Sequence, residues 1–158
     1  MTVPHPKSAE PGGTTAPEPV RRPSPWRGQG DVVAVVALGG AIGAAARYGA
    51  TLLWPAPSAG FPWAVFWINV MGCAVIGVLM VVITELRAVH RLVRPFFGTG
   101  VLGGFTTFST YTVDIQRLAD AGHPRTALVY LLATLPAALA AVWLAMVATR
   151  PALAWRQR

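Results

Sequence analysis

One apolar segment, from about Pro95 to Leu118, constrains this chain most, because its middle does not suit an ordinary membrane helix. Between Gly98 and Tyr111 it carries four glycines, then a series of hydroxyl side chains and two aromatic residues three positions apart. Glycine weakens a helix, and non-helical backbone at membrane depth is stable only where protein buries it or a watery cavity receives it. We therefore predict a membrane helix that is broken near Gly103-Gly104.

Three further apolar stretches are long enough for the ~20 residues that cross a bilayer as a helix. They run from about Asp31 to Trp54, from about Phe61 to Leu86 and from about Thr126 to Thr149. Only 12% of the residues are charged, whereas a soluble domain carries about 25%. The sequence therefore predicts an all-α membrane protein with four transmembrane helices.

The two ends of the chain differ from this membrane domain, which we expect at residues 31–149. Residues 1–30 are rich in proline, glycine, serine and threonine, and this composition predicts a disordered cytoplasmic tail. Residues 150–158 are basic and are expected to form a second, short cytoplasmic tail.

Charge and composition also limit the function. The formal net charge of +7 and the pI of about 11.1 would suit a nucleic-acid binder, but the basic residues lie between apolar spans, as in membrane-protein loops. We therefore expect lipid and not nucleic acid as a partner. The sequence offers no catalytic triad, no paired carboxylates and no metal-ligating cluster, so we expect no enzyme.

Two polar residues inside the spans are candidates for an ion pathway. Arg47 continues the face of Gly39 and Gly43, a G-x-x-x-G pattern that lets another helix approach closely. Its charge would attract anions in a watery vestibule, or its long side chain would only reach a polar layer. Asn69 would donate to a pore ion through its amide, or it would only join two helices.

The hydroxyl-rich stretch suggests which ion passes. Ser109 and Thr110 are neutral donors, and the electron-poor ring edges of Phe108 and Tyr111 suit an anion. Neutral donors bind an ion well enough to dehydrate it and weakly enough to release it. The alternative is a kinked helix whose hydroxyls bond to their own carbonyls. The pattern favours an anion pathway without naming the anion.

The break itself suggests a cation site. Carbonyls freed by an interrupted helix suit Na⁺, and a symmetric dimer that pairs two breaks would supply carbonyls from both chains.

The motifs together resemble the Fluc/CrcB family of fluoride channels over about Asp31 to Thr149. The resemblance is carried by Gly39-Gly40-x-x-Gly43-Ala44-x-x-Arg47-Tyr48, by Asn69-x-x-Gly72, and most specifically by Gly103-Gly104-Phe105-Thr106-Thr107-Phe108-Ser109-Thr110-Tyr111. It implies an antiparallel dimer with two fluoride pores. It also implies passive fluoride export, which protects the cell from fluoride that enters as the neutral acid.

The resemblance further implies roles for individual residues. A central structural Na⁺ would be held by the backbone carbonyls of Gly103 and Thr106. Asn69 matches the pore asparagine of the family, and Phe108 matches the first phenylalanine of its aromatic box. Tyr130 and Thr134 match polar positions of the fourth helix. This sequence departs from the family at Tyr111, where phenylalanine is usual, and at Pro136-Ala137-Ala138, where later hydroxyls are absent.

The basic residues predict one fixed orientation with both termini cytoplasmic, since Lys and Arg favour the cytoplasmic side. The other side receives only Arg117 and Arg125, and an antiparallel dimer would then need a homologous chain of opposite bias. The side predicted as cytoplasmic receives Lys7, Arg21, Arg22, Arg27, Arg87, Arg91, Arg94, Arg150, Arg156 and Arg158.

Two other functions fit the sequence less well. A small four-helix multidrug transporter would need a membrane-embedded carboxylate, but the first two spans offer only Asp31 and Glu85, at their ends. A non-conducting or partner-dependent subunit of a heterodimeric fluoride channel is suggested by Tyr111 and by the depleted fourth span. A homodimer and a heterodimer both remain open from the sequence.

Overall fold

The computed structural model describes residues 29–55, 60–85 and 90–156, and these residues contain helices and no strand. The predicted N-terminal tail lies almost entirely outside this range. The helical elements, in chain order, are α1 (Gly30–Leu53), α2 (Trp63–Glu85), the π-helix η1 (Arg94–Leu102), α3 (Gly103–Phe105), α4 (Ser109–Asp120) and α5 (Pro124–Arg156).

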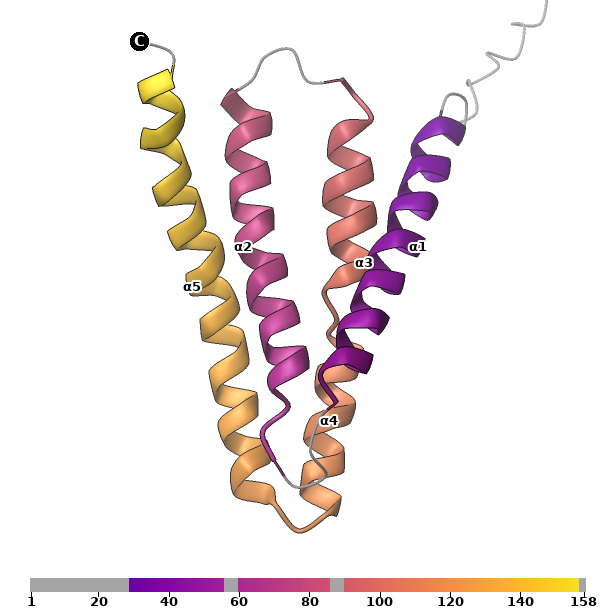
Figure 1. Ribbon diagram of the computed structural model, residues 1–158, viewed down its shortest axis with the longest axis vertical. Coiled ribbons are helices and arrows are strands. Elements are labelled where there is room, and N and C mark those ends of the chain that lie inside the picture. Colours follow the sequence, from indigo (N-terminus) through magenta and orange to yellow (C-terminus); the bar gives the residue numbers. More distant parts are fainter. Residues whose placement is uncertain (1–28, 56–59, 86–89, 157–158) are drawn as a thin grey trace, which may run out of the picture.

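The elements run alternately up and down a bundle, and α3 continues into α4 across a short non-helical link (Figure 1). Three helices in the described ranges are long and apolar enough to cross a membrane, namely α1, α2 and α5 as far as Leu153. The predicted third span is instead made of η1, α3 and α4, which follow one another from one end of the bundle to the other. The start of α1 and the end of α5 lie at the same end of the bundle (Figure 1).

Glycines bring α1 against the broken segment. A Cβ at Gly39 would lie 2.6 Å from the carbonyl oxygen of Phe96, and a Cβ at Gly100 would lie 3.0 Å from the Cα of Gly39. A Cβ at Gly43 would overlap the backbone of Val101. The prediction that Gly39 and Gly43 form a close-packing face is therefore confirmed, and the neighbour is η1.

Helix α2 packs mainly on α5. A Cβ at Gly77 would lie 2.5 Å from the carbonyl oxygen of Val142 and 2.9 Å from the Cβ of Ala145. Helix α5 continues through Pro136, which has no N–H to donate to the preceding turn.

The break lies a few residues after the predicted position. Gly103 has helical angles (φ −64°, ψ −35°), and the backbone becomes extended at Thr106 (φ −72°, ψ 155°). A Cβ at Gly104 would collide with the backbone of Gly40 and would lie 3.1 Å from the nitrogen of Ala44. Gly104 is therefore needed for close packing on α1, and the helix ends later, at Phe105, before the non-helical link of residues 106–108.

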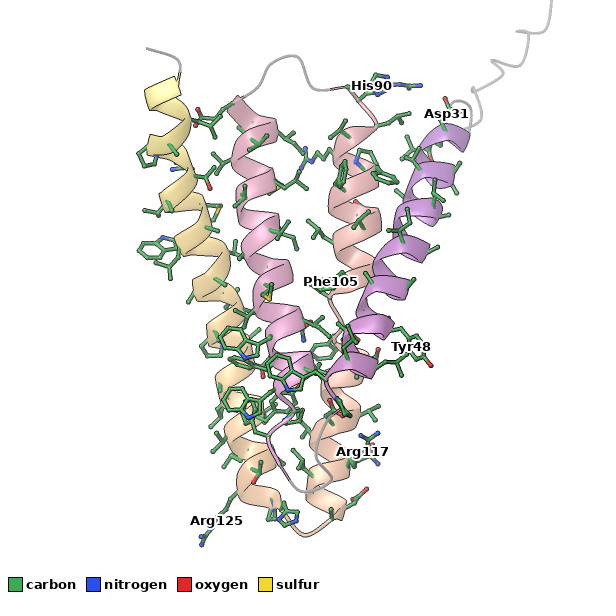
Figure 2. All side chains as sticks on the ribbon, viewed as in Figure 1. Asp31, Tyr48, His90, Phe105, Arg117 and Arg125 are labelled. Carbon is green, nitrogen blue, oxygen red and sulfur yellow. The ribbon has the colours of Figure 1, made fainter. Side chains whose placement is uncertain are left out.

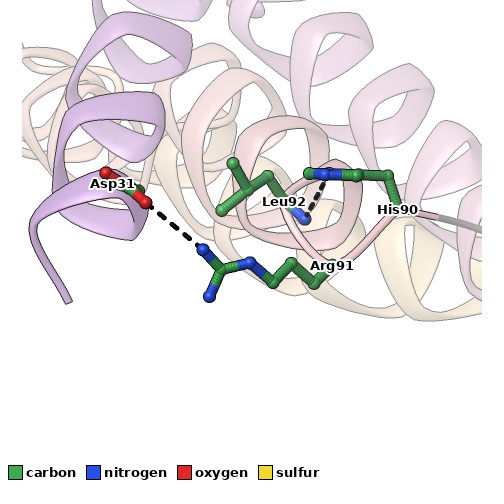
Figure 3. Close-up of polar contacts among 4 residues, drawn as sticks. All are labelled: Asp31, His90, Arg91 and Leu92. Carbon is green, nitrogen blue, oxygen red and sulfur yellow. Dashed lines mark hydrogen bonds and ion pairs between the residues drawn. The ribbon is translucent and has the colours of Figure 1, made fainter. Parts of the chain in front are cut away.

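Contacts at the ends of the bundle complete the arrangement. Asp31 at the start of α1 accepts a hydrogen bond from Arg91, with Nη2 and Oδ2 3.2 Å apart, and the backbone N–H of Leu92 donates to Nδ1 of His90 (Figure 3). Arg117 and Arg125 lie at the opposite end (Figure 2). The Asp31–Arg91 ion pair is exposed, so we expect it to contribute little to stability.

Candidate functional site

The break is held on one side by Asn69 of α2. Its Nδ2 donates to the carbonyl oxygen of Thr107 at 3.0 Å, and its Oδ1 accepts from the backbone N–H of Thr107 at 2.8 Å. Both residues are buried, with 8% of each exposed. One amide N–H group is used in this pairing, which leaves the second for another partner.

Thr107 connects the break to the helix that follows. Its Oγ1 accepts the backbone N–H of Thr110 at 3.1 Å, which is the capping bond of a helix N-terminus. The same oxygen lies 3.0 Å from Oγ1 of Thr110 and 3.2 Å from Oγ of Ser109. The hydroxyls of Ser109 and Thr110, which the sequence predicted in the pathway, therefore belong to one network centred on Thr107.

Arg47 of α1 holds the other side of the break. Its Nε donates to the carbonyl oxygen of Gly104 at 3.1 Å, and its Nη1 lies 3.5 Å from Oγ1 of Thr110. The side chain is half-buried against the break. Its predicted role as a vestibule charge stays a prediction, and these contacts give it a defined position.

An apolar groove of about 480 Å³ opens beside the break. Four predicted pathway residues line it, and Ser109, Thr110 and Tyr130 do not. The lining residues are Asn69, Cys73, Thr106, Thr107, Phe108, Tyr111, Leu131, Leu132, Thr134, Leu135 and Ala138. The groove therefore places the Asn69 amide among apolar walls, where a hydrogen bond to a charged ligand is strong.

The two aromatic residues of the motif differ in their surroundings. Their ring centroids are 5.7 Å apart, but Phe108 is 78% exposed while Tyr111 is buried. The hydroxyl of Tyr111 donates to the carbonyl oxygen of Leu131 at 2.9 Å. This hydroxyl therefore ties α4 to α5, and it is not an additional free donor.

The two predicted residues of α5 lie one turn apart. Thr134 donates its hydroxyl proton to the carbonyl oxygen of Tyr130 at 2.8 Å. The ring of Tyr130 is fully buried against Phe61 and Tyr111, and its hydroxyl has no hydrogen-bond partner among the described residues. A buried donor without a partner is rare in folded proteins, but Tyr130 does not line the groove, so its role in the anion pathway stays a prediction.

A second unpartnered atom, which the sequence did not single out as a site, lies on α4. Oδ2 of Asp114 is buried and has no hydrogen-bond partner among the described residues, and Oδ1 lies 3.4 Å from Nη1 of the exposed Arg117. Asp114 and Tyr130 therefore each bring an unsatisfied polar atom to the contact between α4 and α5.

Two backbone carbonyls at the break suit a cation. In a continuous helix Gly103 would accept from Thr107 and Thr106 from Thr110, but these N–H groups bond to Asn69 and to Oγ1 of Thr107 instead. Within the described part of the chain, no hydrogen bond to the carbonyl of Gly103 or of Thr106 is observed. Neutral carbonyl oxygens match the preference of Na⁺, so the residues predicted for Na⁺ fit that ion.

Comparison with known proteins identifies the family. The model of the family described as "CrcB-like protein, Camphor Resistance (CrcB)" matches residues 34–146. The chain belongs to the CrcB family. The match includes α2, the break and most of α1 and α5, so the family resemblance predicted from the motifs is confirmed.

Individual CrcB relatives are similar over most of their length. Fluoride-specific ion channel FluC 2 of Streptomyces avermitilis is 71% identical over 135 residues, which are 85% of each chain. Fluoride-specific ion channel FluC 1 of Streptomyces coelicolor is 64% identical over 157 residues, 99% of each chain. FluC 3 of Streptomyces avermitilis is 44% identical over 80% of this chain and 62% of its own. These relatives are named as channels and not as enzymes, and none is named as a multidrug transporter.

Thr107 is the residue of this CrcB site that sequence reasoning underestimated. In the sequence it is one of several hydroxyl residues, and nothing in the composition marks it as a site residue. A threonine three positions before Thr110, at the start of a polar helical stretch, is a capping signal, and this signal would have located the break.

Proposed function

We propose that this chain is a fluoride-specific ion channel that exports fluoride passively across the cell membrane and so limits its toxicity. The observation that carries the proposal is the groove at the break, where the Asn69 amide faces apolar walls beside Phe108. Neutral donors in a site of low polarity suit a small anion that must enter and leave quickly. The relatives named as fluoride-specific ion channels support fluoride as that anion.

The proposed channel is an antiparallel dimer with a central Na⁺. Within the described part of one chain, the carbonyls of Gly103 and Thr106 receive no hydrogen bond, and a cation such as Na⁺ needs more oxygen ligands than two. Two chains that cross at their breaks would provide both pairs. The exposed ring of Phe108 would then be covered by the partner. When bound, Na⁺ would supply a positive charge that attracts the carbonyl oxygens of both chains.

We further propose that this chain inserts in one orientation with both termini in the cytoplasm. The ends of the described chain lie at one end of the bundle, as an even number of crossings requires (Figure 1). An antiparallel partner of opposite charge bias is then a second CrcB chain. The occurrence of FluC 2 and FluC 3 in one Streptomyces avermitilis strain is compatible with such pairs.

The second candidate is a partner-dependent or non-conducting subunit of a heterodimeric fluoride channel. It is favoured by one observation, the hydroxyl of Tyr111, which is bonded to Leu131 at a position where the family usually has phenylalanine. A pore that this chain lines by itself would then depart from the family pattern at this position.

Ion efflux from liposomes that contain this chain alone tests both candidates. Fluoride and chloride electrodes record release after the membrane potential is collapsed. Release of fluoride without chloride is expected for a self-sufficient channel. Folded protein that releases neither ion, but releases fluoride once the second CrcB chain is co-expressed, would support the partner-dependent subunit. Release of neither ion with the partner present would refute the channel proposal.

A further inference from the structure

Arg47 contacts both halves of the broken segment. Through Nε it reaches the carbonyl oxygen of Gly104, in α3, at 3.1 Å, and through Nη1 it approaches Oγ1 of Thr110, in α4, at 3.5 Å. The two acceptors stand on opposite sides of the non-helical link at residues 106–108. A single side chain of α1 therefore spans the break.

The break creates the need for this contact. In a continuous helix the Gly104 carbonyl would accept the N–H of Phe108, but no such bond is found in the described chain. A carbonyl left without a partner at membrane depth is costly, and the guanidinium group supplies the missing donor. Because the Gly104 carbonyl is occupied by Arg47, the proposed cation would bind the carbonyls of Gly103 and Thr106 and not that of Gly104.

The same side chain affects the Thr110 hydroxyl. Oγ1 of Thr110 lies within hydrogen-bond distance of Arg47 Nη1 and of Thr107 Oγ1. When both groups donate to it, the two lone pairs of Thr110 are used and its own proton is left for a third partner. Donation from a cation also makes this proton a stronger donor.

We propose that Arg47 is a positioning residue that fastens the two halves of the broken segment together and orients the Thr110 hydroxyl as a donor. The part of the proposal that concerns Thr110 rests on the proposed function, because it assumes that an anion passes this hydroxyl. The fastening of α3 to α4 does not depend on it. A free vestibule charge is the alternative, and the two roles differ in what a lysine would preserve.

Lysine separates the two roles because it keeps the charge and loses the shape. Arginine presents several N–H donors in a rigid planar fork, whereas lysine presents one compact ammonium group. If Arg47 acts only as a vestibule charge, its function should be retained in Arg47→Lys. If it acts through its contacts with Gly104 and Thr110, the function should be lost in this variant. Arg125, which lies at the end of the bundle away from the break (Figure 2), provides the matched control Arg125→Gln.

The experiment compares the full-length chain with Arg47→Lys, Arg47→Gln and Arg125→Gln, together with the partner chain if flux requires it. Initial efflux from liposomes is measured over a range of fluoride concentrations. We expect both Arg47 variants to lose about tenfold in maximal flux, the factor for one hydrogen bond to a charged group. The half-saturating fluoride concentration should change little, and Arg125→Gln should match the wild type.

Hydrogen–deuterium exchange of a peptide over residues 103–112 provides a readout that needs no flux. The proposal expects faster exchange at this peptide in both Arg47 variants and unchanged exchange in α2. Wild-type exchange in Arg47→Lys, or a flux deficit in Arg47→Gln that disappears at high fluoride, would overturn it. If the wild type conducts no fluoride, the proposed function fails while the exchange comparison still decides the fastening role.

Variants of Thr110 test the contact between Arg47 and Thr110 if the Arg47 variants fold poorly. Thr110→Ser keeps the acceptor and should show wild-type hydrogen–deuterium exchange over residues 103–112, and Thr110→Val removes it and should accelerate that exchange. The increase in exchange of the double variant Arg47→Gln/Thr110→Val should be smaller than the sum of the increases in the two single variants, because the two residues act as one unit. Full additivity would show that the 3.5 Å contact has no role.

Discussion

The side-chain amide of Asn69 pairs with both backbone groups of Thr107, by bonds of 3.0 Å and 2.8 Å. This pairing replaces the bonds that Thr107 would make inside a continuous helix. Asn69 lies on α2, 38 residues earlier in the chain, so the break of the third segment is maintained by another helix. The residue predicted as a pore donor is therefore also part of the structure that keeps the break open.

Asn69→Ala is expected to destabilise the fold as well as reduce fluoride flux. It leaves a buried N–H and a buried C=O of Thr107 without partners, and each unsatisfied buried group costs about 1–3 kcal/mol. Asn69→Asp keeps the acceptor but turns a carboxylate oxygen toward the carbonyl oxygen of Thr107 and buries a charge among apolar walls, so it should not restore the lost stability. Thermal unfolding in detergent, monitored beside liposome efflux, measures both effects. An Asn69→Ala protein of wild-type stability would contradict the role in holding the break.

The place of the break shows what sequence reasoning achieves here and where it stops. The apolar stretches predicted both ends of α1 and α2 and the start of α5 to within two residues, since the length of an apolar stretch is a local property. Helix α5 continues from the predicted end near Thr149 to Arg156. Glycine content predicted the break near Gly103-Gly104, but Gly104 serves close contact with α1, since a Cβ there would collide with the backbone of Gly40. The helix ends where Asn69 accepts the N–H of Thr107 and the side chain of Thr107 accepts the N–H of Thr110. A contact between residues distant in the chain is not encoded in local composition.

The directions of the side chains could not be predicted from the sequence either. The sequence identified Tyr111 as a departure from the family, but it does not tell where the hydroxyl points. In the structure this hydroxyl donates to the Leu131 carbonyl, a contact that depends on how α4 and α5 pack. Similarly, Arg47 was identified as an unusual charge, but its acceptors are set by the close approach of α1 to the broken segment.

The two adjacent glycines before the break should respond differently to alanine. Gly104→Ala is expected to destabilise the protein because the new Cβ would collide with the backbone of Gly40, and a clash of this kind typically costs about 1–3 kcal/mol. Gly103→Ala is the matched control, since its Cβ would meet nothing closer than the carbonyl oxygen of Gly98 at 3.9 Å. Thermal unfolding of the two variants measures the difference, and equal stabilities would contradict the packing role of Gly104.

Tyr111→Phe is expected to retain selective fluoride flux and to lose about 1 kcal/mol of stability, the usual value of one hydrogen bond. The hydroxyl is bonded to Leu131, so its removal changes the contact between α4 and α5 more than the groove. Flux and thermal unfolding are measured on the same preparation. A large increase in flux would show that the hydroxyl obstructs the pathway, in agreement with the non-conducting alternative.

Phe108→Ile is expected to cut fluoride flux by about tenfold or more while leaving the chain folded. The ring is 78% exposed in a single chain, so shortening it creates no cavity within the chain, and its electron-poor edge is lost to the anion. Liposome efflux and size-exclusion chromatography report flux and assembly separately. Phe108→Tyr keeps the ring and serves as the control. Undiminished flux in the isoleucine variant would remove Phe108 from the pathway.

Removal of Na⁺ is expected to lower the thermal stability of the assembled channel. A ligand that binds only the folded state stabilises it by mass action, so the melting temperature should rise with Na⁺ concentration. The carbonyls of Gly103 and Thr106 are the proposed ligands because the N–H groups that would bond to them are taken by Asn69 and Thr107. Titration with NaCl against choline chloride at constant ionic strength separates a specific ion from screening.

Asn69→Ala frees the N–H of Thr107 to compete for the Gly103 carbonyl, so the Na⁺ dependence of the melting temperature should weaken in that variant. A melting temperature that does not depend on Na⁺ in the wild type would mean that the free carbonyls have another partner.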